Sequence, residues 1–442
     1  MKRTFTLPVL VVIVSTFAGF SQNIDSAKLD AYFETLFEHN RFMGSVAIAQ
    51  GGELIYSKTI GFADVEQGIK ANENSKFRIG SITKTFTAVL TLKAVEENRL
   101  DLNQTIDKWF PTIGYADKIT IEYLLRHRSG LHNFTDEWVS SGRHTQPKTE
   151  QEIIETIIQS GNDFLPNART SYSNAGYFLL TFILERVFEK PFSKILDTKI
   201  VQPFGLKNTR LGERINTQNN ESNSYTFLNN VWNREAEFDM SQVLGAGAII
   251  STSTDLVAFS HALFSGKLIS ENSLQQMKTI QDHFGMGLIQ MPFHNRTGFG
   301  HSGGIDGFRS IFAYFSDGEV SIALISNGLN FNFNDITIAV LNAAYNMPFE
   351  IPEFTTFNAA YVDLNQFTGV YSSRQIPLQM TITKVDNQLF GQGTGQPAFP
   401  LEMTGENKFE FRAAGVVLEF NPAENTMVLR QGGGVFTFTR ED

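Results

Sequence analysis

The chain of 442 residues contains no cysteine. That absence excludes disulfides, thiolate metal sites, a cysteine nucleophile and a lipid attached to a cysteine at the signal cleavage site. The eight histidines follow neither the H-E-x-x-H pattern nor a paired spacing with acidic residues, so we expect no metal and no other cofactor. A cysteine-free chain must be held together by core packing, and 42% hydrophobic residues are enough for a large core.

Positive charge is also scarce. Lysine and arginine number 36 against 46 aspartates and glutamates, which gives a formal net charge of −10 at pH 7. A chain this acidic, without a basic cluster, lacks the footprint of a nucleic-acid-binding protein. After residue 21, no segment has the roughly 18 uninterrupted apolar residues that a membrane span needs. We therefore expect a small-molecule or peptide substrate, no nucleic acid and no stable membrane span, while the oligomeric state stays open.

Residues 1–21 have the composition of a secretory signal peptide. Two basic residues precede an uncharged apolar stretch over residues 7–20, and small residues before Gln22 suit cleavage at that point. An uncleaved membrane anchor is the alternative, but the stretch is short for a span and contains Pro8. The sequence therefore predicts an exported protein, periplasmic or secreted.

The remaining chain divides into two parts of different character. Within residues 22–346, alternating apolar residues predict a hairpin across Gly51-Gly52, and helical patterns dominate the middle. Further strand patterns cover residues 286–290, 307–315 and 320–326. We expect an α+β domain over 22–346, in which one antiparallel sheet is covered by helices and a largely helical lobe is inserted between its early and late strands.

The C-terminal part reads differently. Pro348 and Pro352 mark a linker over residues 347–361. Residues 362–442 alternate in short runs that are separated by Gly- and Asn-containing turns, which predicts a small all-β barrel or meander. Upstream, the polar stretch 216–238 lacks periodicity and carries aromatic residues, so it is either a substrate-facing loop or an ordinary surface excursion.

The pattern Ser81-Ile82-Thr83-Lys84 occurs once and opens an apolar helical segment. Residues three apart are neighbours on a helix, so the Lys84 amine can reach the Ser81 hydroxyl. A serine hydroxyl is a poor nucleophile until a neighbouring base takes its proton. Burial in an apolar helix favours the neutral amine that can serve as this base. Taken alone, the pattern also fits a capping serine with an exposed lysine.

Two later motifs change that balance. Tyr172-Ser173-Asn174 opens another helical segment, and Gly300-His301-Ser302-Gly303-Gly304 precedes the strand that begins near residue 307. The order S-x-x-K, Y-x-N, H-x-G resembles the serine β-lactamase and penicillin-binding-protein superfamily. A tyrosine in the second motif is similar to the class C β-lactamases and to related esterases and D-peptidases. Other stretches that match this family are Leu124–Leu131, Pro203–Leu206 and Gly245–Gly247.

The resemblance spans about residues 25–345 and implies a role for each motif. It implies that Ser81 is the nucleophile and that Lys84 and Tyr172 are general bases. It also implies an oxyanion hole made by the backbone N–H groups of Ser81 and Gly304. The implied substrate-binding residues are Asn174, His301, Ser302, Gly303 and Gly304.

One position departs from the family pattern. His301 stands where β-lactamases and carboxypeptidases have the lysine of K-T-G, and an ordinary histidine is near half-charged at pH 6.5. The permanently charged ammonium that would pair with a substrate carboxylate is thus replaced by an imidazole that is only partly charged. This change favours esters or peptides that do not depend on a terminal carboxylate. Arg309 would restore a positive charge, although a solvated strand position is the simpler interpretation. His127, within the matching stretch 124–131, is interpreted as structural.

The sequence therefore predicts an exported serine hydrolase that cleaves an ester, a D-peptide or amide, or a β-lactam through an acyl-enzyme on Ser81. The alternatives are a penicillin-sensing or binding module that acylates without turnover, and a D-Ala-D-Ala carboxypeptidase. The preferred substrate and the role of the C-terminal β module cannot be read from the sequence.

Overall fold

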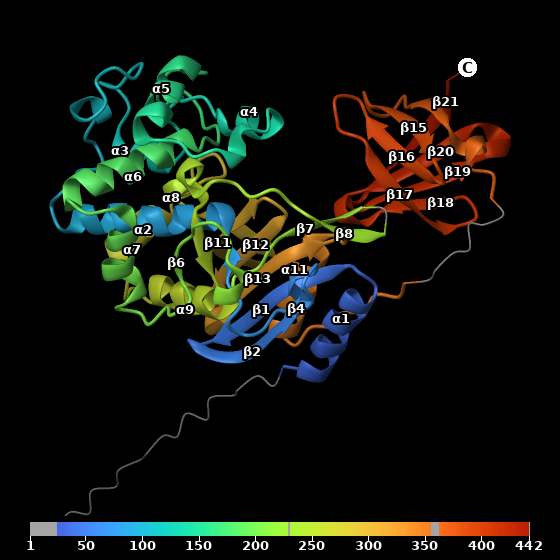
Figure 1. Ribbon diagram of the computed structural model, residues 1–442, viewed down its shortest axis with the longest axis horizontal. Helices are drawn as coiled ribbons and strands as arrows, with labels where there is room; N and C mark the ends of the chain where they lie inside the picture. Colours follow the sequence, from blue (N-terminus) through green and yellow to red (C-terminus); the bar gives the residue numbers. More distant parts are fainter. Residues whose placement is uncertain (1–23, 229, 355–361, 442) are drawn as a thin grey trace, which may run out of the picture.

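The computed structural model describes residues 24–228, 230–354 and 362–441. The predicted signal peptide lies outside these residues, as do residues 355–361 of the predicted linker. Figure 1 shows a central sheet flanked by helices, a helical lobe next to it, and a barrel that forms a separate body. This arrangement confirms the predicted α+β fold followed by a small all-β barrel.

The central sheet has the strand order β10-β11-β12-β13-β1-β2, and each neighbouring pair is antiparallel. Its strands are β1 (Phe42–Gln50), β2 (Glu53–Ile60), β10 (Ile289–Phe293), β11 (Arg296–Ile305), β12 (Phe308–Phe315) and β13 (Val320–Leu329). Gly51 and Gly52 join β1 to β2 with φ angles of 58° and 85°, which glycine adopts without steric cost. The predicted hairpin and the late strands therefore share one sheet. The strand predicted over 286–290 begins instead at Ile289, because Gly287 adopts a φ of 65° and turns the chain.

Side chains of the central strands alternate between two buried faces. Along β1, Val46 and Ile48 pack in one apolar cluster with residues of α1 (Ser26–Glu38) and α11 (Phe333–Ala344). Ala47 and Ala49 belong to the other cluster, which includes α9 (Ser253–Phe264). A period of two along the strand therefore divides the core into two layers, one on each face of the sheet.

The helical lobe is organised around α2 (Thr83–Glu96), which packs against α6 and α8. Every residue from Thr83 to Leu92 is buried, as expected for a helix that is enclosed on all sides. The other helices of the central part of the chain are α3 (Ile121–Leu125), α4 (Thr135–Ser140), α5 (Glu150–Ser160), α6 (Ala175–Phe188), α7 (Phe192–Leu196), α8 (Leu244–Gly247) and α10 (Glu271–Lys278). Short strands in the same region are β3 (Phe62–Asp64), β4 (Ile69–Lys70), β5 (Phe77–Arg78), β6 (Arg210–Leu211) and β9 (Ile249–Ser251).

The polar stretch 216–238 is not a plain loop. It contains the antiparallel pair β7 (Tyr225–Leu228) and β8 (Val231–Arg234), and β7 pairs in parallel with the end of β13. Exposed residues dominate this pair, so it lacks the clear apolar alternation that would have marked it in the sequence. Its position beside β13 brings the following residues Glu235, Ala236 and Phe238 to the cavity described below.

Eight strands close the C-terminal barrel around its own apolar cluster. They are β14 (Gly369–Ser372), β15 (Gln379–Val385), β16 (Gln388–Gly393), β17 (Phe399–Gly405), β18 (Lys408–Phe411), β19 (Val416–Asn421), β20 (Thr426–Gln431) and β21 (Gly434–Arg440). A salt bridge of 2.6 Å joins the buried Arg41 to Glu402 of β17. The ring of Phe354 lies against the guanidinium groups of both Arg41 and Arg412. These contacts attach the barrel to the body that carries the sheet.

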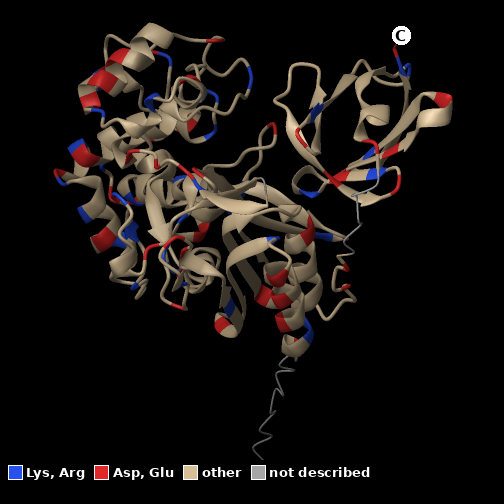
Figure 2. Cartoon of the chain, turned by 45° about the vertical axis from the view of Figure 1, so that its right-hand side comes forward, with Lys and Arg blue, Asp and Glu red and all other residues tan. Residues whose placement is uncertain are grey.

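In the view of Figure 2, Lys and Arg are interspersed with Asp and Glu along the described chain. Across the described ranges, no helix combines the length and the apolar character that a membrane crossing requires.

Candidate active site

The predicted nucleophile lies where a tight turn feeds a buried helix. Ser81 is in the short 3₁₀ helix η1 (Gly80–Ile82), directly before α2. Gly80 adopts a φ of 51°, and a Cβ atom at this position would lie only 2.8 Å from the backbone nitrogen of Gly304. Glycine is therefore required twice, for its conformation and for the close approach of β11. The result is a serine held at the end of a rigid helix beside a strand.

Lys84 is one turn further along α2 and is fully buried. Its Nζ lies 3.1 Å from Ser81 Oγ, 2.7 Å from Asn174 Oδ1 and 2.8 Å from the carbonyl oxygen of Ala246. All three partners are uncharged. Burial without a carboxylate partner lowers the pKa of Lys84 well below its ordinary value. The amine is therefore set up to be neutral and to accept the Ser81 proton.

Tyr172 approaches the same hydroxyl from the segment before α6. Its phenolic oxygen lies 2.7 Å from Ser81 Oγ, and Lys84 Nζ lies 4.9 Å from the centre of its ring. Ser81 is thus in hydrogen-bond contact with two groups that can take or give a proton. The structure brings Ser81, Lys84 and Tyr172 together as the sequence motifs predicted.

Asn174 is the residue before α6, and its amide has a fixed orientation. Its Oδ1 accepts from Lys84, while its Nδ2 donates to Thr135 Oγ1 at 2.8 Å and to Asn133 Oδ1 at 3.2 Å. Thr135 and Asn133 had no sequence motif of their own. They lie some 40 residues before Asn174, and only the packing of the lobe brings them to it.

The third motif runs along β11. A Cβ atom at Gly303 would lie 2.0 Å from the Ile79 carbonyl oxygen and 3.0 Å from the Ser81 nitrogen, so only glycine lets the strand lie against η1. This contact brings the backbone of Gly303 and Gly304 against that of Gly80 and Ser81. Ser302 is exposed and is not among the residues that line the cavity.

His301 differs from the sequence expectation in its charge. Its side chain is buried, and burial together with the nearby Lys84 lowers its pKa to about 4. The expectation of a half-charged ring at pH 6.5 is therefore wrong, because solvent does not reach the imidazole. Nδ1 donates to the Ser302 carbonyl oxygen at 2.6 Å, which leaves Nε2 without a proton in the neutral ring. His301 cannot act as a cationic anchor at neutral pH.

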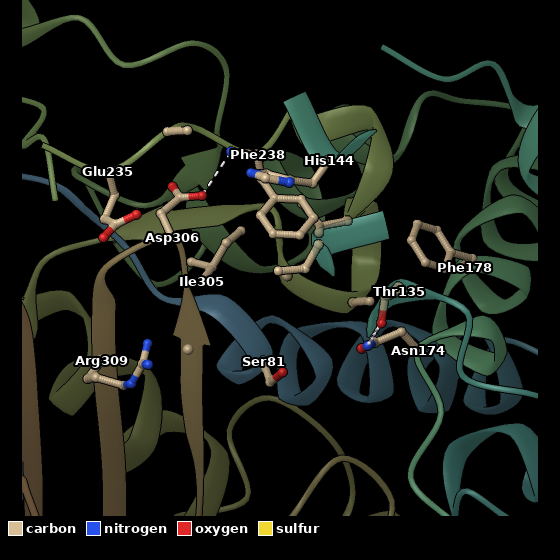
Figure 3. A pocket seen from close by; sticks show the side chains of 16 residues that line it. Ser81, Thr135, His144, Asn174, Phe178, Glu235, Phe238, Ile305, Asp306 and Arg309 are labelled. Atoms are coloured by element: carbon tan, nitrogen blue, oxygen red, sulfur yellow. Dashed lines mark hydrogen bonds between the residues drawn. The ribbon is translucent and has the colours of Figure 1, made fainter. Parts of the chain in front are cut away.

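A cavity of 440 Å³ opens beside Ser81 (Figure 3). Its apolar wall consists of Val139, Phe178, Ala236, Phe238, Val243, Ala246 and Ile305. Thr135, His144 and Asn174 add polar groups, and Glu235, Asp306 and Arg309 lie toward the far end from Asn174. Arg309, interpreted from the sequence as a solvated strand residue, is exposed but lines this cavity.

A buried ion-pair network supports one wall of the cavity. The Arg78 guanidinium, 1% exposed, donates to Asp306 at 2.8 Å and to Glu237 at 2.9 Å. It also donates to the carbonyl oxygen of Phe238, whose N–H group donates to Asp306. Burial raises the pKa of Asp306, and the Arg78 charge opposes that shift. This network fastens the segment that carries Phe238 to the end of β11, and no motif predicted it.

Within the described residues, no group of three or more His, Asp or Glu side chains is arranged to hold a metal ion. The site can therefore support acyl transfer to the Ser81 hydroxyl. A buried amine and a phenol contact this hydroxyl, and the backbones of η1 and β11 lie close together beside it.

Comparisons with known proteins agree with this geometry. Residues 29–346 match the family model described as "Beta-lactamase". The chain is 26% identical over 431 residues to "Penicillin-binding protein 4*" of Bacillus subtilis (strain 168), covering 90% of this chain and 94% of that one. It is 26% identical to "Teichoic acid D-alanine hydrolase" of Staphylococcus aureus (strain MRSA252), covering 68% of this chain and 73% of that one. The crystal structure of D-amino acid amidase from Ochrobactrum anthropi SV3 with L-phenylalanine amide superposes with a TM-score of 0.64 at 28% identity, covering 73% of this chain and 99% of that one.

Proposed function

The chain belongs to the beta-lactamase family and is a serine hydrolase, and from this premise we propose that it cleaves D-amino acyl esters or amides through an acyl-enzyme on Ser81. The observation that carries the proposal is the position of Ser81 Oγ, 3.1 Å from the Lys84 amine and 2.7 Å from the Tyr172 hydroxyl. The buried amine, whose pKa is lowered, can act as the base for this serine, and the phenol can carry its proton.

The proposed reaction has two halves. In the first, Lys84 takes the Ser81 proton while Oγ attacks the substrate carbonyl, and the N–H groups of Ser81 and Gly304 stabilise the oxygen that gains negative charge. The bond to the leaving group then breaks, and Tyr172 supplies the proton that the leaving alcohol or amine needs. In the second half, a water molecule loses a proton to the Tyr172 phenolate and attacks the ester on Ser81, and the Lys84 ammonium supplies the proton for the departing Ser81 oxygen. The acid is released and Ser81 regains its proton.

The choice of acyl group rests on the relatives and on the cavity. The names of two relatives are "Teichoic acid D-alanine hydrolase" and "D-amino acid amidase", and both specify a D-amino acid, which supports a D-amino acyl group here. The cavity is lined by Asn174 and Gly304 but not by Tyr172, so in the proposed mechanism it receives the acyl side of the substrate. Its apolar wall suits a hydrophobic side chain. The neutral His301 supports substrates without a terminal carboxylate on the leaving side.

We further propose that the enzyme acts outside the cytoplasm and that the N-terminal segment directs it there, because residues 1–21 have the composition of a signal peptide. A D-Ala-D-Ala carboxypeptidase is the second candidate, because Arg309 lines the cavity and offers a cation to a carboxylate. A penicillin-binding module that acylates without turnover remains the non-catalytic alternative.

One experiment separates these functions. Purified protein is incubated with p-nitroanilides and esters of D- and L-amino acids, with a D-Ala-D-Ala peptide, and with a fluorescent penicillin. Multiple turnovers with a D-amino acyl ester or amide, at least tenfold faster than with its L-isomer, are the expected result. Release of D-alanine from the peptide alone would establish the carboxypeptidase. Stoichiometric labelling by penicillin without turnover of any substrate would establish the binding module. The Ser81→Ala variant is the control that must be inactive in every arm.

A further inference from the structure

The imidazole ring of His127 packs against the ring of Tyr172. It follows α3 in the stretch 124–131, adopts a φ of 57° and is 3% exposed. The imidazole and phenol rings lie 4.4 Å apart at an angle of 33°. Phe284 closes the same aromatic group, with its ring 5.0 Å from that of His127 and 5.8 Å from that of Tyr172. The Tyr172 ring therefore has two aromatic neighbours that limit its rotation.

The backbone around Tyr172 depends on the same histidine. Residues 171–173 belong to no helix or strand, so no ladder of hydrogen bonds fixes them. The N–H group of Ser171 donates to the His127 carbonyl oxygen at 2.9 Å. The N–H group of Ser173 donates to the His127 ring at Nδ1, at 3.2 Å. One residue thus holds the chain immediately before and immediately after Tyr172.

The second of these bonds sets the state of the ring. Because Nδ1 accepts a hydrogen bond, the proton of the neutral imidazole must be on Nε2. Burial, with the nearby Lys84 as a smaller cause, holds the pKa of His127 well below its ordinary value. A neutral ring can accept from Ser173, whereas a protonated ring would have to give up that bond.

We propose that His127 is a positioning residue for Tyr172, holding the phenolic oxygen at hydrogen-bond distance from Ser81 through its ring and through Nδ1. The inference rests on the role of Tyr172 in the proposed function. It assigns a part in catalysis to a residue whose sequence pattern indicated only a scaffold. A displacement of about 1 Å at a reacting group can cost roughly 100-fold in rate, so loss of either contact should reduce turnover even though His127 is not in hydrogen-bond contact with Ser81.

Two variants separate the two contacts. His127→Phe retains an aromatic ring but removes the acceptor for Ser173. His127→Asn removes the ring but places an amide oxygen near the position of Nδ1. We expect each variant to lower kcat by about 10- to 100-fold with KM changed less than about twofold. His261→Phe, the same substitution at a half-buried histidine of α9, is the matched control and should leave kcat within about twofold.

A double-mutant cycle with Tyr172→Phe distinguishes positioning from general destabilisation. Single-turnover acylation by a fluorescent penicillin and steady turnover of a D-amino acyl ester are measured for the wild type, both single variants and the double variant. If His127 acts through the Tyr172 hydroxyl, His127→Phe will change the rate less than about twofold once that hydroxyl is removed. Thermal melting shows that each variant is folded, and His127→Asn provides the second cycle if His127→Phe does not fold.

An alternative result is that His127→Phe reduces the rate by the same factor in the wild type and in Tyr172→Phe, while Ser81→Ala and Tyr172→Phe are both impaired. That result would overturn the inference and leave the proposed function intact. A folded His127→Phe variant with wild-type kcat would do the same. Wild-type rates in Tyr172→Phe itself would overturn both the inference and the proposed role of Tyr172.

Discussion

The contact between β11 and the turn that carries Ser81 leads to a prediction about two neighbouring glycines. A Cβ atom at Gly303 would lie 2.0 Å from the Ile79 carbonyl oxygen, 2.5 Å from Ser310 Oγ and 3.0 Å from the Ser81 nitrogen. Cβ contacts below 3.0 Å essentially do not occur, so Gly303→Ala must displace the strand or the turn by about 1 Å. At Gly304 the nearest atom to an added Cβ is Nη1 of Arg309 at 3.3 Å, the end of a flexible side chain.

The two substitutions should therefore differ sharply. In Gly303→Ala the N–H group of Gly304 moves away from the oxygen that it is proposed to stabilise, and losing one such donor costs about 100- to 1000-fold in kcat, or about 2.7–4 kcal/mol. Overpacking should also lower stability by about 1–3 kcal/mol. Gly304→Ala keeps the same N–H group and should retain kcat within about threefold.

Single-turnover acylation with a fluorescent penicillin and steady turnover of a D-amino acyl ester give the two rates, and thermal melting shows that both variants are folded. A folded Gly303→Ala variant that keeps more than about a third of the wild-type rate would contradict the proposed role of the Gly304 N–H group. So would a Gly304→Ala variant that is the slower of the two.

Four further outcomes follow from the same contacts. Because burial lowers the pKa of Lys84, kcat/KM should rise with pH and reach a plateau well below pH 10.4, the ordinary pKa of lysine. A pH–rate profile that still rises at pH 10 would contradict a neutral Lys84. Because the pKa of His301 is about 4, the ratio of the rate with a carboxylate-bearing ester to the rate with an uncharged ester should not change from pH 5.5 to 8. His301→Lys should raise this ratio. A wild-type ratio that falls between pH 6 and 7 would contradict a neutral His301. Arg78→Met leaves Asp306 buried without its cation and should lower the free energy of unfolding by about 3–5 kcal/mol in denaturant titration; a loss below 1 kcal/mol would show that the pair matters little. A chain that ends at Phe354 loses the partner of Arg41 and should be less stable, yet it should still be acylated at Ser81, and a folded truncation that is not acylated would show that the barrel completes the site.

The sequence predicted the parts of the site that depend on local geometry. Ser81 and Lys84 are three residues apart on one helix, so their contact follows from helical spacing alone. The close approach of β11 to the turn that carries Ser81, which Gly303 permits, was not predicted from the third motif and is seen only in the structure. The matching order of the three motifs then allowed Tyr172 and His301 to be assigned to the same site, and the structure confirms that Tyr172 is in contact with Ser81.

What the sequence did not predict depends on burial and on long-range pairing. The Arg78–Asp306 pair joins residues that are 228 positions apart in the chain. A single sequence does not distinguish a buried arginine from an exposed one. The charge of His301 depends on solvent exclusion by residues from other elements, so a reference pKa misled the prediction. The β7–β8 pair was not predicted, because its mostly exposed residues show no alternation of apolar and polar side chains. His127 had the appearance of a scaffold residue, and only its contacts with residues 171–173 indicate more.

In the proposed function, hydrolysis passes through an ester on Ser81. Its most direct test is mass spectrometry of intact protein quenched in acid within seconds of mixing with a D-amino acyl ester, followed by peptide mapping. We expect a transient mass increase equal to one acyl group on the peptide that contains Ser81. It disappears as substrate is exhausted and is absent from Ser81→Ala. An adduct on any other residue, or sustained turnover by Ser81→Ala above about a thousandth of the wild-type rate, would contradict it.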